Sequence, residues 1–94
     1  MSKEVEFPNR DRFIELGLMI SSLRKRQGMS QEQLAEKAKL SRSHLSAIEA
    51  PNIVRPFSLE VLFNIADALG VRAGDLLNAT FPEEKTYQNR GPNS

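Results

Sequence analysis

The sequence predicts an all-α, compact domain built from five short helices. Apolar residues recur at three- and four-residue spacing in several segments, which is typical of helices with one buried face. Serines stand where three of these segments begin, and glycines stand where two of them end, as helix caps do. No segment alternates apolar and polar residues as a strand does. With 94 residues and 39% hydrophobic content, the chain has room for one domain with a modest core.

The first helix is expected to begin at Arg10, with Asn9 as its cap, and to run to about Gln27. Gly28 is its expected stop, because glycine adopts the left-handed conformation that ends many helices. Residues 1–8 before it are expected to form a flexible arm. The apolar positions on its predicted buried face are Phe13, Leu16, Ile20 and Leu23.

The second and third helices are predicted to be joined by a very short turn. Ser30 and Gln33 have the spacing of a capping box, which starts a helix from Gln31 to about Ala38. Ser41 caps the next helix, which runs to Glu49. Short helices connected so tightly cannot lie antiparallel, so they must cross at a wide angle. This is the helix-turn-helix arrangement, predicted here for residues 31–49.

Two further helices are expected after a loop bounded by prolines. Ser58 caps the fourth helix, which ends at Gly70. Its predicted buried stripe contains Leu59, Leu62, Phe63, Ala66 and Leu69. A fifth helix is expected at about 73–78, and its predicted core residues are Leu76 and Leu77. The domain is therefore expected to span residues 9–81, followed by a disordered polar tail at 82–94.

Composition excludes several classes of site. The chain has no cysteine and one histidine, which argues against disulfides, thiolate metal sites and histidine metal clusters. No cofactor and no small-molecule ligand are expected. No apolar run is long enough to cross a membrane, and the first residues lack the apolar core of a signal peptide, so a cytoplasmic protein is expected.

Charge is unevenly distributed along the chain. Residues 24–55 contain seven basic and three acidic residues, a net charge of +4, whereas the remainder has a net charge of −3. A locally basic segment suits a surface that faces phosphates, although such runs also occur on ordinary solvated faces. Charge alone does not decide between these interpretations.

The segment Leu16–Leu77 resembles the lambda-repressor-like helix-turn-helix domains, also called the Xre or Cro/C1 family. The matching text is LRKRQGMSQEQLAEKAKLSRSHLSAIE followed by RPFSLEVLFNIADALGV, which agrees in order, spacing and caps. The resemblance implies a five-helix domain whose third helix enters the DNA major groove. The sequence departs from the family at Lys39, where glycine is usual, and at Ala50 and Pro51. A left-handed Lys39 would cost roughly 1 kcal/mol, which predicts a slightly strained turn.

The same resemblance implies structural roles for several residues. Ala35 occupies a position where the second helix passes close to the third and only a small side chain fits. Leu45 and Ile48 fill the family's apolar positions on the third helix. Arg24 and Glu49 are implied to form a largely buried ion pair between the first and third helices.

Candidate base-reading residues lie on the third helix. With Leu45 and Ile48 facing the core, the residues predicted to point outward are Ser43, Ser46, Ala47 and Ala50, with Arg42 and His44 on the flanks. The resemblance places Arg42, Ser43 and Ala47 at base-contacting positions. Base contact is favoured for Arg42 because arginine pairs bidentately with guanine, and the alternative is a phosphate contact; Ala47 is either a thymine-methyl contact or a spacer.

Other candidates are expected to face the DNA backbone. The resemblance implies that Gln31 contacts a phosphate and braces the first residue of the third helix; the alternative is a solvated helix start. Arg55 is a candidate phosphate contact, and His44 is either near a phosphate or simply a polar flank. The helix starts at Ser30 and Ser58 offer free backbone N–H groups. The predicted DNA-binding residues are Gln31, Ser41, Arg42, Ser43, His44, Ser46, Ala47 and Arg55.

These features favour a sequence-specific, double-stranded DNA-binding transcriptional regulator, a repressor or autoregulator. The alternative is a protein-interaction module with the same fold, such as an antitoxin or a co-activator. An enzyme is the weakest interpretation, because the sequence has no paired carboxylates, nucleophile elbow, glycine-rich phosphate loop or metal cluster.

A homodimer on a palindromic operator is also expected, because one recognition helix reads too few base pairs to select a site in a genome. The apolar residues that exceed the needs of a five-helix core, some of which should be exposed, are Ile14, Leu18, Ile65 and Phe81. The alternative is that these residues only fill the edge of the core. The resemblance favours Leu76–Phe81 as the contact between subunits, with the arm at Phe7 as the alternative.

Overall fold

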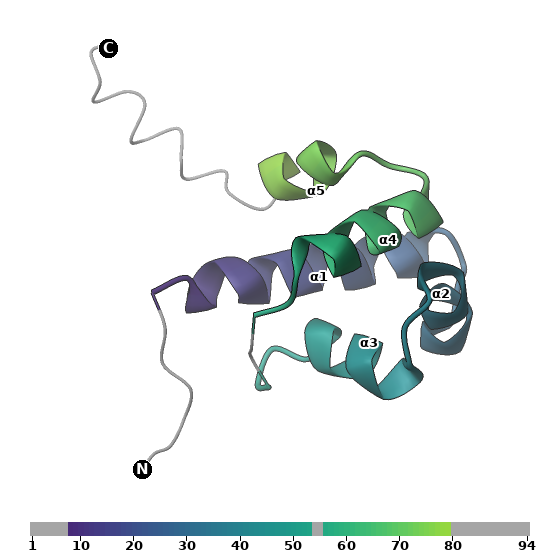
Figure 1. Ribbon diagram of the computed structural model, residues 1–94, viewed down its shortest axis with the longest axis horizontal. Coiled ribbons are helices and arrows are strands. Elements are labelled where there is room, and N and C mark those ends of the chain that lie inside the picture. The colour runs from purple at the N-terminus through teal and green to yellow at the C-terminus, as the bar shows by residue number, and fades with distance from the viewer. Residues whose placement is uncertain (1–7, 54–55, 80–94) are drawn as a thin grey trace.

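The chain forms five helices around one core, as shown by a computed structural model that describes residues 8–53 and 56–79 (Figure 1). The helices are α1 (Arg10–Arg26), α2 (Gln31–Ala38), α3 (Arg42–Glu49), α4 (Leu59–Leu69) and α5 (Ala73–Ala79). No strand occurs in the described ranges, so the predicted all-α fold is confirmed. Both α3 and α5 pack on α1, and they lie on opposite sides of it in Figure 1. None of the helices in this part of the chain is long and apolar enough to span a bilayer.

Every helix contributes to the core. The largest fully buried side chains come one from each helix, in chain order Ile20, Leu34, Leu45, Ile65 and Leu76. Two small residues of α2, Ala35 and Ala38, are also buried, and α2 packs against both α3 and α4. Burial of these apolar side chains fixes how α3 is held against the rest of the domain.

Serine side chains begin three of the five helices, as predicted. Ser30, Ser41 and Ser58 each accept a hydrogen bond from the backbone N–H three residues later, at 3.0, 3.0 and 3.1 Å. Ser30 completes a capping box, because the Gln33 side chain also accepts from the Ser30 N–H at 2.8 Å. The expected cap at Asn9 is wrong in one respect: Asn9 precedes α1, but its side chain makes no cap bond and instead accepts from the Arg12 guanidinium.

Three helices end in the same hydrogen-bonded turn, with a residue in the left-handed region. That residue is Gly28 after α1 and Gly70 after α4, with φ of 76° and 75°. After α2 it is Lys39, with φ of 61° and ψ of 42°. In that turn the N–H of Leu40 donates to the carbonyl oxygen of Ala35 at 2.9 Å, which satisfies a carbonyl at the end of the helix. The predicted left-handed turn at Lys39 is therefore confirmed.

The predicted buried face of α4 is right for Leu62, Ala66 and Leu69 and wrong for Leu59 and Phe63. Ile65 is fully buried, whereas Leu59 is 65% exposed and Phe63 is 51% exposed. The buried stripe is Leu62, Ile65, Ala66 and Leu69, which has the same three- and four-residue spacing as the predicted stripe. Because α4 carries apolar residues on almost every side, spacing alone did not identify the side that packs. In α5, similarly, Leu76 is buried but Leu77 is 37% exposed.

Candidate nucleic-acid interface

The α2–turn–α3 unit exposes the start of α3. Arg42, Ser43 and His44 are exposed in its first turn, while Leu45 and Ile48 are buried. Ser46 and Ala47, predicted to point outward, are half-buried. The backbone N–H of His44 donates to the hydroxyl of Ser41, so Ser41 both caps α3 and lies at its exposed end. The side chains that α3 presents to solvent before Glu49 include no acidic residue.

A buried ion pair joins α1 to the last residue of α3. The guanidinium of Arg24 donates to the two carboxylate oxygens of Glu49, from Nε to Oε2 at 2.9 Å and from Nη2 to Oε1 at 3.0 Å. Arg24 Nη1 donates to the carbonyl oxygen of Met29 at 2.7 Å, in the turn before α2. The two side chains are 9% and 4% exposed. The implied pair is therefore present, and its two-point geometry fixes the direction of the guanidinium.

Gln31 extends this network to the start of α2. Its side-chain amide donates to Glu49 Oε1 at 2.9 Å. The expected partner was the first residue of α3, whereas the bond goes to the last residue of that helix. An amide nitrogen carries two hydrogens, and one of them remains for another acceptor. Gln31 and Glu49 are 18 residues apart in the sequence, and this spacing does not indicate a contact, because the contact depends on the angle between α2 and α3.

A glycine in α1 allows α3 to approach. Gly17 is buried, and a Cβ placed on it would overlap the carbonyl oxygen of Ile48. The same Cβ would lie 3.3 Å from the carbonyl carbon of Ile48 and 3.6 Å from the Cα of Glu49. All three atoms belong to the backbone of α3, so they cannot move aside as a flexible side chain does. Gly17 thus sets the distance between α1 and α3, a role absent from the sequence-based prediction.

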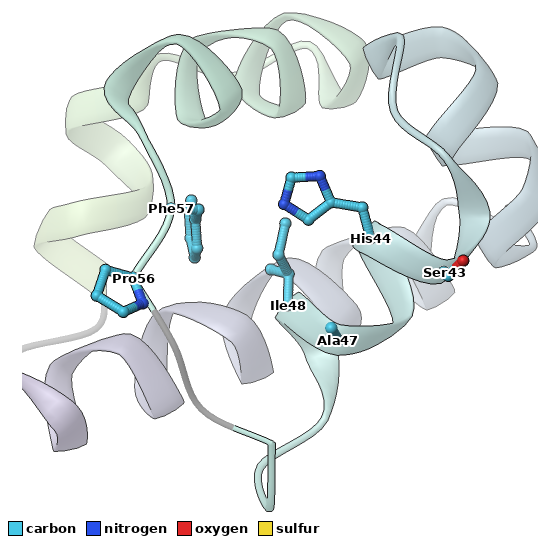
Figure 2. A pocket seen from close by; sticks show the side chains of 6 residues that line it. All are labelled: Ser43, His44, Ala47, Ile48, Pro56 and Phe57. Carbon is cyan, nitrogen blue, oxygen red and sulfur yellow. The ribbon is translucent and has the colours of Figure 1, made fainter. Parts of the chain in front are cut away.

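A hollow lies on one flank of α3. Its volume is about 370 Å³, and it is lined by Ser43, His44, Ala47 and Ile48 of α3 and by Pro56 and Phe57 before α4. Figure 2 shows His44 and Phe57 on opposite sides of the hollow, with Ile48 between them. The Phe57 ring packs edge to face on Phe13 of α1, with ring centres 5.2 Å apart, so this wall is held in place.

The helix-turn-helix family matches residues 20–76 of the chain. The chain belongs to this family. Several solved structures are similar to it, among them three of regulators. The restriction-modification controller protein C.AhdI from Aeromonas hydrophila is 31% identical over 68% of this chain and 94% of that one, with a TM-score of 0.63. The clp gene regulator ClgR from Corynebacterium glutamicum is 25% identical over 86% and 84%, with a TM-score of 0.70. C.Esp1396I bound to a 25 base pair operator site is 26% identical over 84% and 96%, with a TM-score of 0.68.

The resemblance to lambda-repressor-like, Xre-type domains is therefore confirmed. No curated protein matches the sequence. The family and its solved neighbours are DNA-binding regulators and not enzymes, so this helix-turn-helix protein is a DNA-binding transcriptional regulator. In the part of the chain that the structure describes, histidine and acidic residues form no group that could hold a metal ion.

The basic segment of this helix-turn-helix protein remains basic at its surface. Arg24 and Glu49 are buried together, and their opposite charges cancel. The other charged residues of the segment 24–55 therefore still sum to +4. The exposed basic residues in its described part are Lys25, Arg26, Lys37, Lys39 and Arg42. Arg55, a predicted phosphate contact, lies outside the described residues, as do Phe7 and Phe81, the two aromatic residues considered for the dimer.

Proposed function

We propose that this helix-turn-helix protein is a sequence-specific repressor or autoregulator that occupies a palindromic operator as a homodimer. The observation that carries the proposal is the exposed start of α3, which presents Arg42 and Ser43 on a face without acidic side chains. Acidic residues there would repel DNA phosphates, whereas small and basic residues let a helix enter the major groove. A similar protein, C.Esp1396I, is bound to an operator in its solved structure, which supports DNA as the partner.

Individual contacts are proposed from position on the domain. Arg42, Ser43 and Ala47 would contact base edges. Ser46 would lie beside these residues, on the side of α3 that is near the start of α2. Gln31, His44 and Arg55 would contact the backbone, and Ser41 would offer its hydroxyl at the α3 end. Gln31 is well placed for this role, because its bond to Glu49 holds the amide at the start of α2 while a second N–H stays available. Phosphate contacts position the protein, and base contacts select the sequence.

Binding to duplex DNA is expected to weaken steeply with salt. Contacts between basic residues and phosphates release counterions, so a fourfold rise in salt should lower affinity roughly tenfold or more. Fluorescence anisotropy with a labelled random duplex measures this directly. An affinity that does not change with salt would contradict the electrostatic contribution of the basic segment.

Replacing Arg42 and Gln31 with alanine is expected to have different effects. Arg42→Ala should reduce discrimination at one base pair by about 1–3 kcal/mol, because one bidentate contact is lost. Gln31→Ala should weaken binding to most sequences alike. Arg72→Ala is the matched control, since Arg72 is exposed in the connection between α4 and α5, outside the α2–turn–α3 unit. Selection of bound sites from a random pool gives the profiles, and identical profiles for the two variants would remove Arg42 as a base-reading residue.

The protein is expected to be a dimer at tens of micromolar. Two recognition helices related by a two-fold axis would reach half-sites about 34–36 Å apart, roughly one turn of DNA. Of the apolar residues first considered for this contact, Ile65 is excluded because it is buried, whereas Leu18 is 49% exposed. Leu77, which is 37% exposed, lies on α5, where the subunit contact is expected. Sedimentation velocity decides the matter, and a strict monomer that binds one per site would contradict the proposal.

A further inference from the structure

A groove between α1 and α5 lies outside the α2–turn–α3 unit. Its volume is about 270 Å³, and its lining residues are Asn9, Arg12, Phe13 and Leu16 at the start of α1 and Leu77 of α5. The two helices pack on each other, on the side of α1 opposite to α3 (Figure 1). Three of the five lining side chains are apolar, so the groove suits an apolar side chain rather than a strongly charged ligand.

The sequence places an aromatic residue within reach of this groove. Phe81 follows Leu77 by four residues, the spacing that puts two side chains on the same face of a helix. The helix α5 ends at Ala79, and an extended chain spans about 3.3–3.6 Å per residue. The Cα of Phe81 therefore lies within about 7 Å of the Cα of Ala79. A phenyl ring at that position can reach the apolar side chains of the groove.

The charges on the two sides are complementary. Glu83 and Glu84 follow Phe81 in the sequence, whereas the charged residue that lines the groove is Arg12. The Arg12 guanidinium donates to the side-chain oxygen of Asn9 at 3.3 Å, and Asn9 is itself a lining residue, so the positive charge lies at the edge of the groove. Two carboxylates that follow an aromatic residue match an apolar groove with a basic edge.

We propose that this groove is a docking site for residues 80–84 of the same chain, with the Phe81 ring against Phe13 and Leu77 and the acidic pair beside Arg12. Docking there would hold α5 on the start of α1. It would also use Phe81 inside its own subunit, so a contact between subunits at α5 would have to use other residues. The proposal does not depend on the proposed function, because the groove shares no residue with the helix-turn-helix.

The test uses introduced cysteines in the full-length protein, whose sequence contains none. Asn9→Cys is combined in turn with Pro82→Cys, Glu83→Cys and Glu84→Cys, because a disulfide requires Cα atoms about 4.4–6.8 Å apart. Mild oxidation is followed by thiol titration and non-reducing electrophoresis. We expect at least one of these pairs to form a disulfide within one chain. Adding Phe81→Ala to that pair should slow the reaction several-fold.

Ser43→Cys supplies the matched control, because Ser43 is exposed at the start of α3 and does not line the groove. Paired with the same three cysteines, it should react far more slowly than Asn9→Cys. Equal rates at the two positions would mean that residues 80–84 have no docking site at the groove, and would overturn the proposal. Disulfides formed only between chains would also overturn it, since the groove would then be occupied by a second copy.

Thermal unfolding gives an independent measurement. Phe81→Ala should lower the melting temperature by about 4–8 °C, because a side chain that buries apolar surface is lost. Tyr87→Ala removes another aromatic residue, one that follows the proposed docking segment, and should leave the melting temperature unchanged. A loss in Phe7→Ala without one in Phe81→Ala would assign the groove to the N-terminal arm and overturn the proposal. None of these outcomes depends on whether the protein binds DNA, so failure here and failure of the proposed function are distinguishable.

Discussion

Replacing Glu49 with alanine is expected to lower the free energy of unfolding by about 3 kcal/mol or more. The change removes a carboxylate that accepts two hydrogen bonds from Arg24 and one from Gln31. Arg24 is 8% exposed, so its guanidinium would keep its charge in a buried position, and the Met29 carbonyl would be its one remaining partner among the described residues. A buried charge that loses its partner costs several kcal/mol. Urea unfolding followed by circular dichroism measures the difference.

Two further variants separate this effect from ordinary loss of charge. Glu36→Ala removes an exposed carboxylate from α2 and should change stability by less than about 0.5 kcal/mol. The double variant Arg24→Met, Glu49→Leu removes both charges and should recover much of the loss, because no unpaired charge remains buried. If Glu49→Ala cost under about 0.5 kcal/mol, the pair would behave as an exposed one, against the burial found here.

The ion pair also connects stability to the proposed DNA-binding surface. Glu49 is the point where α1, the start of α2 and the end of α3 meet through side chains. Gln31→Ala removes one of its bonds and should cost about 1 kcal/mol of stability, in addition to the proposed contact of Gln31 with the DNA backbone. Its DNA affinity therefore has to be compared at a temperature where all variants are folded.

Local signals in the sequence predicted the helix boundaries well. A serine that accepts from the third N–H after it acts within one turn, so Ser30, Ser41 and Ser58 identify helix starts without any knowledge of packing. The turn between α2 and α3 was equally local, and Lys39 adopts the left-handed conformation that its position requires. The family resemblance added the Arg24–Glu49 pair, which spacing alone does not reveal.

Features that depend on packing were not predictable in the same way. On α4, Leu59, Phe63 and Ile65 are all apolar, so the buried side is decided by α2, α1 and α5, which pack against it. The Gln31–Glu49 bond and the hollow beside His44 join segments whose relative placement appears only in three dimensions. Gly17 did leave a signal in the sequence: a glycine directly after a core leucine, inside an amphipathic helix, marks a close backbone approach.

Replacing Gly17 with alanine is expected to destabilise the domain by about 2–3 kcal/mol and to weaken DNA binding. Alanine is the better helix former by roughly 1 kcal/mol, so helix propensity alone predicts the opposite sign. The added Cβ, however, would overlap the Ile48 carbonyl oxygen, and α3 would have to move away from α1 to admit it. Such a movement strains the bond between Arg24 and Glu49 at the end of α3, and it shifts the exposed start of α3 that is proposed to read bases. The matched control is Gly74→Ala in α5, where a Cβ meets no atom within 4 Å. That variant should leave stability unchanged or raise it by up to about 1 kcal/mol. Thermal unfolding and operator affinity measured on both variants test the close approach, and equal stabilisation of the two would show that α3 does not lie against Gly17.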